Sequence, residues 1–288
     1  MRTIGWLMLG TFLAFASPMS ALAGDGGQLA GTGVWADVQD DPYDFKEYSA
    51  FQQLSETADF PEIKALEANL LEQAHRLYTY GELSREITPS DIDYNRAVKI
   101  YMDGAEPAFD DSLESPEHFR AFLENAEYIW VLQVDLGSQT VTYTFDLGKP
   151  VQDDIRSLLS PEQIAEAERQ AGHWRLVNTT WGQEAGESYR SYIKRALEQE
   201  QLDREASVVI IGGTPELRYP AAVLYGPEGV KIIPADPTAN KRMKALLTNS
   251  RGSSGADSGI GDCSDDRIAV CDGEAYRTAL RNTRGGAE

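Results

Sequence analysis

Two cysteines, Cys263 and Cys271, make thiol chemistry the first possibility that this chain raises. Seven residues separate them, in a segment rich in Gly, Ser and Asp. Catalytic pairs are usually C-x-x-C at a helix start, and the neighbouring Asp262, Asp265 and Asp266 would raise a thiol pKa rather than lower it. In an oxidising compartment the sequence therefore predicts a local disulfide, with a redox pair as the alternative.

The three histidines, His75, His118 and His173, lack the spacing of a zinc site. Neither H-E-x-x-H nor a Cys/His ligand pattern occurs in the sequence. The stretch from 255 to 266 offers oxygen ligands without the spacing of a calcium loop, so weak, nonspecific calcium binding is the most that we expect there. The sequence thus predicts no metal site and no cofactor.

Motifs for nucleophilic catalysis are also missing from the sequence. There is no G-x-S-x-G, and Gly212-Gly213-Thr214 is a two-glycine turn rather than a G-x-G-x-x-G phosphate loop. Paired carboxylates can lie far apart in a sequence, so a carboxylate-dependent hydrolase stays open as an alternative. The catalytic residues are unknown, and the balance favours a protein that is not an enzyme.

One locally unusual cluster combines a titratable ring with two large aromatic side chains. His173-Trp174 lies close in sequence to Asn178 and Trp181. The cluster has two interpretations: a functional site around His173, or core packing of the two tryptophans with His173 at a helix edge. We favour packing, because Trp side chains normally dominate cores.

The charge is strongly acidic and unevenly distributed. The net charge is -20, and residues 24 to 126 hold 22 Asp and Glu against 7 Lys and Arg. Such a field repels nucleic acid and anionic lipid, and it favours either simple solubility or a cationic partner. The candidate interaction surface is a group of acidic residues: Asp103, Glu106, Asp110, Asp111 and Glu114.

The first 23 residues have the pattern of a secretory signal peptide. An apolar run from Ile4 to Ala16 follows Arg2, and Ala21-Leu22-Ala23 matches a cleavage site before Gly24. After the signal no apolar stretch is long enough to span a bilayer. We therefore expect a periplasmic or secreted protein without a stable membrane span once the signal is cleaved.

The elements that must position these residues fall into several regions. A Gly- and Asp-rich leader is expected at 24–42, followed by an acidic, all-helical domain at 43–126. Its helices are predicted from Asp59 to Leu77, from Thr88 to Gly104, and from Ser115 to beyond Leu123, because apolar residues recur every three or four positions behind capping residues.

At Glu127 the period changes and predicts an α/β domain over 127–250. A hairpin is expected over 128–147, helices over 160–171 and 184–202, a buried strand at 208–211, a hairpin over 220–234, and a helix from Asp236. Residues 251–288 are expected to form a Gly/Ser/Asp-rich tail with the disulfide. The fold class is α+β, an all-helical region followed by an α/β domain.

Residues 219–247 resemble the C-terminal part of thioredoxin-fold periplasmic disulfide isomerases. The shared features are a Pro at the head of an apolar strand, a Gly turn, a short strand and a helix. The resemblance implies a cis-proline at Pro220, with Pro215 as the alternative, in a thioredoxin-like domain. Because this chain has no C-x-x-C, the resemblance implies a scaffold without its redox centre.

Three functions compete at this point. We favour a non-catalytic accessory or interaction protein of a cell-envelope assembly or secretion system, whose partner is another envelope protein with a cationic surface and not nucleic acid. The alternatives are a thioredoxin-like thiol-disulfide or chaperone protein, and the carboxylate-dependent hydrolase.

Overall fold

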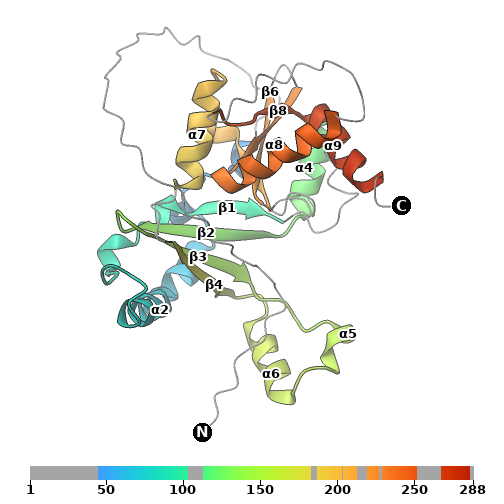
Figure 1. Ribbon diagram of the computed structural model, residues 1–288. Coiled ribbons are helices and arrows are strands. Elements are labelled where there is room, and N and C mark those ends of the chain that lie inside the picture. The colour runs from blue at the N-terminus through green and yellow to red at the C-terminus, as the bar shows by residue number, and fades with distance from the viewer. Residues whose placement is uncertain are drawn as a thin grey trace. The chain divides into compact units, whose positions relative to one another are not determined.

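The computed structural model describes residues 45–102, 113–182, 187–202, 204–212, 219–226, 229–251 and 267–285. The expected signal peptide and the leader at 24–42 lie outside these residues. Residues from Asp41 onward form one compact unit. Its described part combines helices with one mixed sheet of eight strands, which confirms the α+β class (Figure 1). No helix in the described ranges has the length and apolar character to cross a bilayer.

The sheet has the strand order β4-β3-β2-β1-β5-β6-β7-β8. Every neighbouring pair is antiparallel except β1 and β5, which are parallel. The expected hairpins are confirmed as β2 with β3 and β6 with β7. The strands are β1 (Val98–Tyr101), β2 (Tyr128–Asp135), β3 (Thr140–Leu147), β4 (Trp174–Gly182), β5 (Val209–Ile211), β6 (Ala221–Gly226), β7 (Gly229–Pro234) and β8 (Cys271–Asp272).

One face of the sheet carries two hydrophobic clusters beneath two groups of helices. Over β2 and β3, helices α1 (Phe60–Ala65) and α2 (Glu67–Thr79) pack on Trp130, Tyr143 and Phe145. Over β5 to β8, the covering helices are α4 (Pro116–Asn125), α8 (Pro237–Arg251) and α9 (Gly273–Gly285). Period-2 alternation in β3 sends Val141, Tyr143 and Phe145 to this face, because successive side chains of a strand point to opposite sides.

The opposite face is covered mainly by α7 (Tyr189–Gln199). This helix begins at Ser188, whose side chain caps the backbone N–H of Ser191, and it buries Ile193 and Ala196. Those residues pack on Ile210, which belongs to a run that is buried on both sides as its continuous apolar sequence predicts.

A helical arm connects β3 to β4. It consists of α5 (Asp153–Arg156) and α6 (Pro161–Gln170), and neither helix has a fully buried residue. The expected capping box is confirmed, since Ser160 and Gln163 each accept a bond from the other's backbone N–H. Leu158 is 79% exposed on this arm.

The prediction of a helix from Thr88 to Gly104 is wrong. Thr88 does cap a short 3-10 turn at Pro89–Asp91, but a second turn at Tyr94–Arg96 leads into strand β1. The side chains of residues 98–101 alternate between the two faces of the sheet, and Val98 and Ile100 face α7. The backbone of the same residues pairs with both β2 and β5. Tertiary pairing therefore outweighs the helix-like spacing of the apolar residues.

The expected boundary at residue 126 does not separate two cores. Strand β1, from the region expected to be an independent helical domain, lies between β2 and β5. The front residues Phe45 and Phe119 pack with Tyr225 of β6, at ring-centroid distances of 5.4 and 5.3 Å. Residues on both sides of 126 thus belong to the same sheet and share its clusters.

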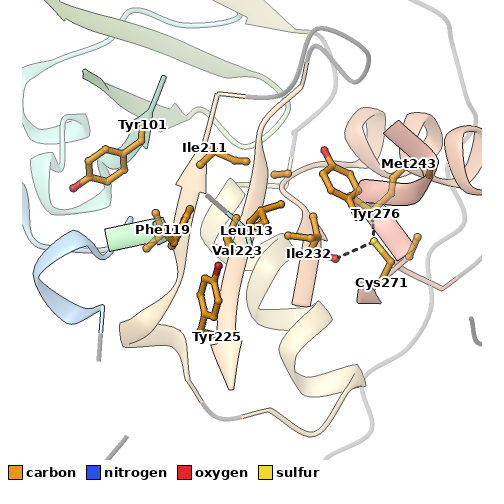
Figure 2. Packing of buried hydrophobic residues seen from close by; sticks show 14 of the residues in the cluster. Tyr101, Leu113, Phe119, Ile211, Val223, Tyr225, Ile232, Met243, Cys271 and Tyr276 are labelled. Carbon is orange, nitrogen blue, oxygen red and sulfur yellow. Dashed lines mark hydrogen bonds between the residues drawn. The ribbon is translucent and has the colours of Figure 1, made fainter. Parts of the chain in front are cut away.

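The expectation of a Gly/Ser/Asp-rich tail is wrong for residues 267–285. They form β8 and α9, and Cys271, Tyr276 and Ala279 are buried against β7 and α8 (Figure 2). The physical reason is that an apolar stripe at positions 276 and 279 follows the short apolar run at 268–271, and both bury against the sheet. Residues 252–266, which prompted the expectation, lie outside the described residues.

Candidate functional site: the outer edge of strand β4

Strand β4 is the long edge of the sheet. Among the described strands it pairs only with β3, so its other side, which we call the β4 edge, has backbone groups without a neighbouring strand. It has nine residues, and Asn178, Thr180, Trp181 and Gly182 are exposed. A long edge of this kind can accept a further strand.

The opposite edge of the sheet is built differently. Strand β8 has only two residues, and Asp272 forms an ion pair with Lys231 of β7 at 2.5 Å. Short length and charge are two of the devices by which proteins protect a sheet edge against unwanted pairing. The β4 edge has neither device along 176–182, where the sequence contains no charged residue.

A carboxylate lies at the beginning of the β4 edge. The carbonyl of His173 points toward β3, because it accepts a hydrogen bond from the backbone N–H of Gly148. The next backbone N–H, that of Trp174, points the other way and donates to Oε2 of Glu62 at 3.0 Å. The other oxygen of Glu62 lies 3.6 Å from Nδ1 of His173. The first outward N–H of the strand is therefore occupied, and the side chain that occupies it is half-exposed and acidic.

A second carboxylate lies at the far end of the strand. The indole Nε1–H of Trp181 donates to Oε2 of Glu82 at 3.1 Å, and the Trp181 side chain is 41% exposed. Glu82 is the third residue after α2, whose last turn and cap include the exposed Tyr78 and Tyr80. This end of β4 thus combines an exposed indole with an acidic group.

The cluster singled out in the sequence is part of this edge. His173 precedes β4, and Trp174, Asn178 and Trp181 belong to it. The expected core packing of the two tryptophans is confirmed for Trp174, which is buried beside Tyr128 with ring centroids 5.7 Å apart, and wrong for Trp181, which lies at the surface. They are seven residues apart on one strand, with a register shift in between, so the strand geometry separates them.

Strand β4 itself was not predicted from the sequence. The signal was available, since Leu176, Val177, Thr179, Thr180 and Trp181 are strand-forming types, interrupted only by Asn178. Its position at the edge of the sheet was not predictable either, because that position depends on the order of the strands, and the local sequence does not encode this order.

Lys99 of β1 is a partly buried lysine. It lies on the sheet face that carries the two helix groups, between them. The ammonium of Lys99 lies 3.9 Å from the ring centroid of Tyr128 and 4.9 Å from that of Tyr101. Burial lowers the pKa of Lys99, and the nearby Asp59 opposes that shift. Asp59 is in turn held by Tyr128 Oη–H at 3.0 Å and Trp130 Nε1–H at 2.9 Å, so this polar group serves to join β1, β2 and the start of α1.

The histidines lie on separate elements. His75 is on α2, 2.7 Å from Glu86, and His118 is in the first turn of α4, where its backbone N–H donates to Ser115. Within the described ranges no three His, Cys, Asp or Glu side chains are placed to hold a metal ion.

The acidic interaction surface falls mostly outside the described residues. Asp103, Glu106, Asp110 and Asp111 belong to the 103–112 gap. Glu114 is described, and its carboxylate forms an ion pair with Arg277 of α9 at 2.7 Å. Glu114 therefore helps to hold α9 in place.

The expectation of a cis peptide bond at Pro220 is wrong. All peptide bonds in the described part of the chain are trans, including the one before Pro220, and Pro215 lies outside that part. The Pro220 carbonyl accepts a bond from the backbone N–H of Ala235, so the residue extends the β6–β7 ladder. A trans bond, the intrinsically preferred isomer, fits this extended entry into a strand.

Cys271 is a free, buried thiol, and Cys263 lies outside the described residues. The Cys271 sulfur contacts the carbonyl of Ile232 and the sulfur of Met243, both at 3.9 Å (Figure 2). Burial raises the pKa of Cys271, and Asp272 raises it further. The geometry is thus opposite to that of a reactive thiolate, and a free thiol here is the alternative to the disulfide predicted with Cys263.

We expect the Cys271 thiol to resist iodoacetamide in the folded protein at pH 8 and to react once the chain is unfolded, because the thiol is both shielded and protonated. Mass spectrometry of the peptide that contains Cys271 measures this. If that peptide stays unlabelled in denaturant until a reductant is added, Cys271 is paired and the disulfide predicted from the sequence is present.

Comparisons with protein-family models, with curated proteins and with solved structures find no match.

Proposed function

We propose that this protein is an exported, non-catalytic interaction protein that binds its partner by strand addition at the β4 edge. The observation that carries the proposal is the length and exposure of β4, whose nine residues have one neighbouring strand among those described. In strand addition, main-chain hydrogen bonds provide affinity, and the side chains beside the edge provide specificity.

The electrostatics of the molecule support a binding role. The net charge of -20 favours fast association with a cationic protein and disfavours nucleic acid. The signal-peptide pattern at 1–23 supports export to the periplasm or medium, and a cell-envelope assembly or secretion system is the setting that we propose.

A thioredoxin-like scaffold is the finer fold that we propose for the second half of the sheet. Its support is the succession of β6, a Gly-containing turn, β7 and α8, which is the order that the resemblance requires. The buried thiol of Cys271 and the trans bond at Pro220 argue against redox chemistry on this scaffold.

Site-specific photocrosslinking in the producing cell tests the proposal. We expect a crosslinker at the exposed position Thr180 of β4 to trap one discrete partner, while the same crosslinker at the exposed position Glu198 of α7 traps none. If both positions give the same products, the contacts are random and the β4 edge is not a docking site.

Adjacent proline substitutions provide a sharper variant. Backbone N–H groups alternate along a strand, so of Thr179→Pro and Thr180→Pro one removes a bond to β3 and the other removes only an outward N–H. The variant that keeps the wild-type melting temperature is the informative one. With the crosslinker moved to the exposed position Asn178, it should lose the crosslinked partner, and a folded variant that retains full crosslinking would count against strand addition.

A further inference from the structure

The two carboxylates beside β4 restrict what the edge can bind. Glu62 lies at the first residue of the strand and Glu82 beside the indole of Trp181. Between them the strand carries one charge, that of Arg175, and Asp146 of β3 lies 3.7 Å from it. The edge is thus close to neutral along its length and acidic at both ends.

From this placement we infer that the occupant of the β4 edge is an extended segment with a basic side chain near each end, an inference that rests on the proposed strand addition. The register shift in β4 places Trp174 opposite Leu147 and Trp181 opposite Val141 of β3, six residues apart, which corresponds to about 20 Å along a regular strand. A partner strand with Lys or Arg six positions apart carries both basic groups on one face and can therefore reach Glu62 with one and Glu82 with the other.

The aromatic surroundings of Glu82 favour arginine at that end. Trp181 is 41% exposed and donates its indole N–H to Glu82, so part of a large ring is available next to the carboxylate. A guanidinium can pair with a carboxylate and stack on an indole at the same time.

A second copy of this chain fits the edge less well. Each copy would bring a net charge of -20, and a two-fold pairing of β4 strands would also bring Glu62 and Glu82 of both copies toward the same interface. Like charges oppose such an association, whereas a cationic segment is attracted over the same surface.

Designed peptides test the inference. The probe is Arg-Thr-Val-Thr-Val-Thr-Arg, whose two Arg share one face, and the matched peptides carry Gln or Glu in place of both Arg. We expect the Arg peptide to bind about tenfold more tightly than the Gln peptide at low salt, since each exposed ion pair contributes about three- to fivefold, and the advantage should shrink in 0.5 M NaCl. Calorimetry gives the affinities, and hydrogen exchange locates the bound peptide.

Charge-neutral variants assign the effect to the two acids. Glu62→Gln and Glu82→Gln should each reduce the preference for the Arg peptide about three- to fivefold, while Glu198→Gln on α7 should leave it unchanged. Gln keeps an oxygen that can accept the bonds from Trp174 and Trp181, so the strand itself is retained.

The outcomes separate the inference from the function on which it rests. If Arg and Gln peptides bind equally and both protect β4 amides from exchange, strand addition stands and the basic segment is overturned. If no peptide protects β4, both are overturned. If β4 amides become protected in the protein alone as its concentration rises, the occupant is a second copy and the inference fails.

Discussion

Trp130→Ala should lower the free energy of unfolding by about 3 to 5 kcal/mol, the range for a large aromatic side chain lost from a core. Trp130 is completely buried on β2, and its Nε1–H donates to Asp59. The substitution leaves a cavity under α1 and removes one of the two donors that hold a carboxylate next to Lys99. Urea denaturation followed by circular dichroism measures the loss.

Trp181→Ala is the matched control, because the same residue type lies on the same sheet at the surface. With 41% of its side chain exposed, Trp181 contributes less burial, and we expect a change of about 0.5 kcal/mol. A loss at Trp181 as large as that at Trp130 would mean that the β4 end is part of the core and would remove the basis for the docking site.

Local signals in the sequence were sufficient where an element depends on its own residues. The strict alternation over 140–147 predicted β3, and Ser160 with Gln163 predicted the start of α6. In these places the period of the apolar residues and the capping chemistry agree with the tertiary environment, so nothing overrides them.

Local signals failed where pairing at long range decides the structure. The spacing of Val98 to Tyr101 predicted a continued helix, yet these residues lie between two strands that come 27 or more residues later in the chain. The final helix was missed for a related reason. The Gly- and Ser-rich composition of 252–266 dominated the interpretation of the whole tail, while Tyr276 and Ala279 bury against β7 and α8.

The candidate site was predictable only in part. The sequence drew attention to His173, Trp174, Asn178 and Trp181, which lie along β4 or directly before it, with the two tryptophans near opposite ends. That β4 is an edge, and that Glu62 and Glu82 from other elements lie at its two ends, follows from strand order and from helix placement. Glu62 and Trp174 are 112 residues apart in the sequence, and Glu82 and Trp181 are 99 residues apart. No local sequence pattern encodes contacts over such separations.

A fragment of residues 127–250 should fail to fold cooperatively. The cut removes β1 from the middle of the sheet, so β2 and β5 lose the strand that joins them. It also removes α1 and α2 from above Trp130 and Tyr143, α4 and Phe45 from beside Tyr225, and the whole of α9. The cut exposes apolar surface on the 127–250 fragment and on the rest of the chain. This surface is too large for either part to remain soluble and ordered alone.

A chain of residues 41–288 is the matched control, since it comprises the whole compact unit and lacks only the first 40 residues. We expect this longer chain to show one cooperative thermal transition, and the 127–250 fragment to show none and to bind a dye for exposed apolar surface. A sharp melt of the short fragment would establish an independent domain after residue 126. The helices before it would then be an accessory layer, and the contribution of β1 to the sheet would be small.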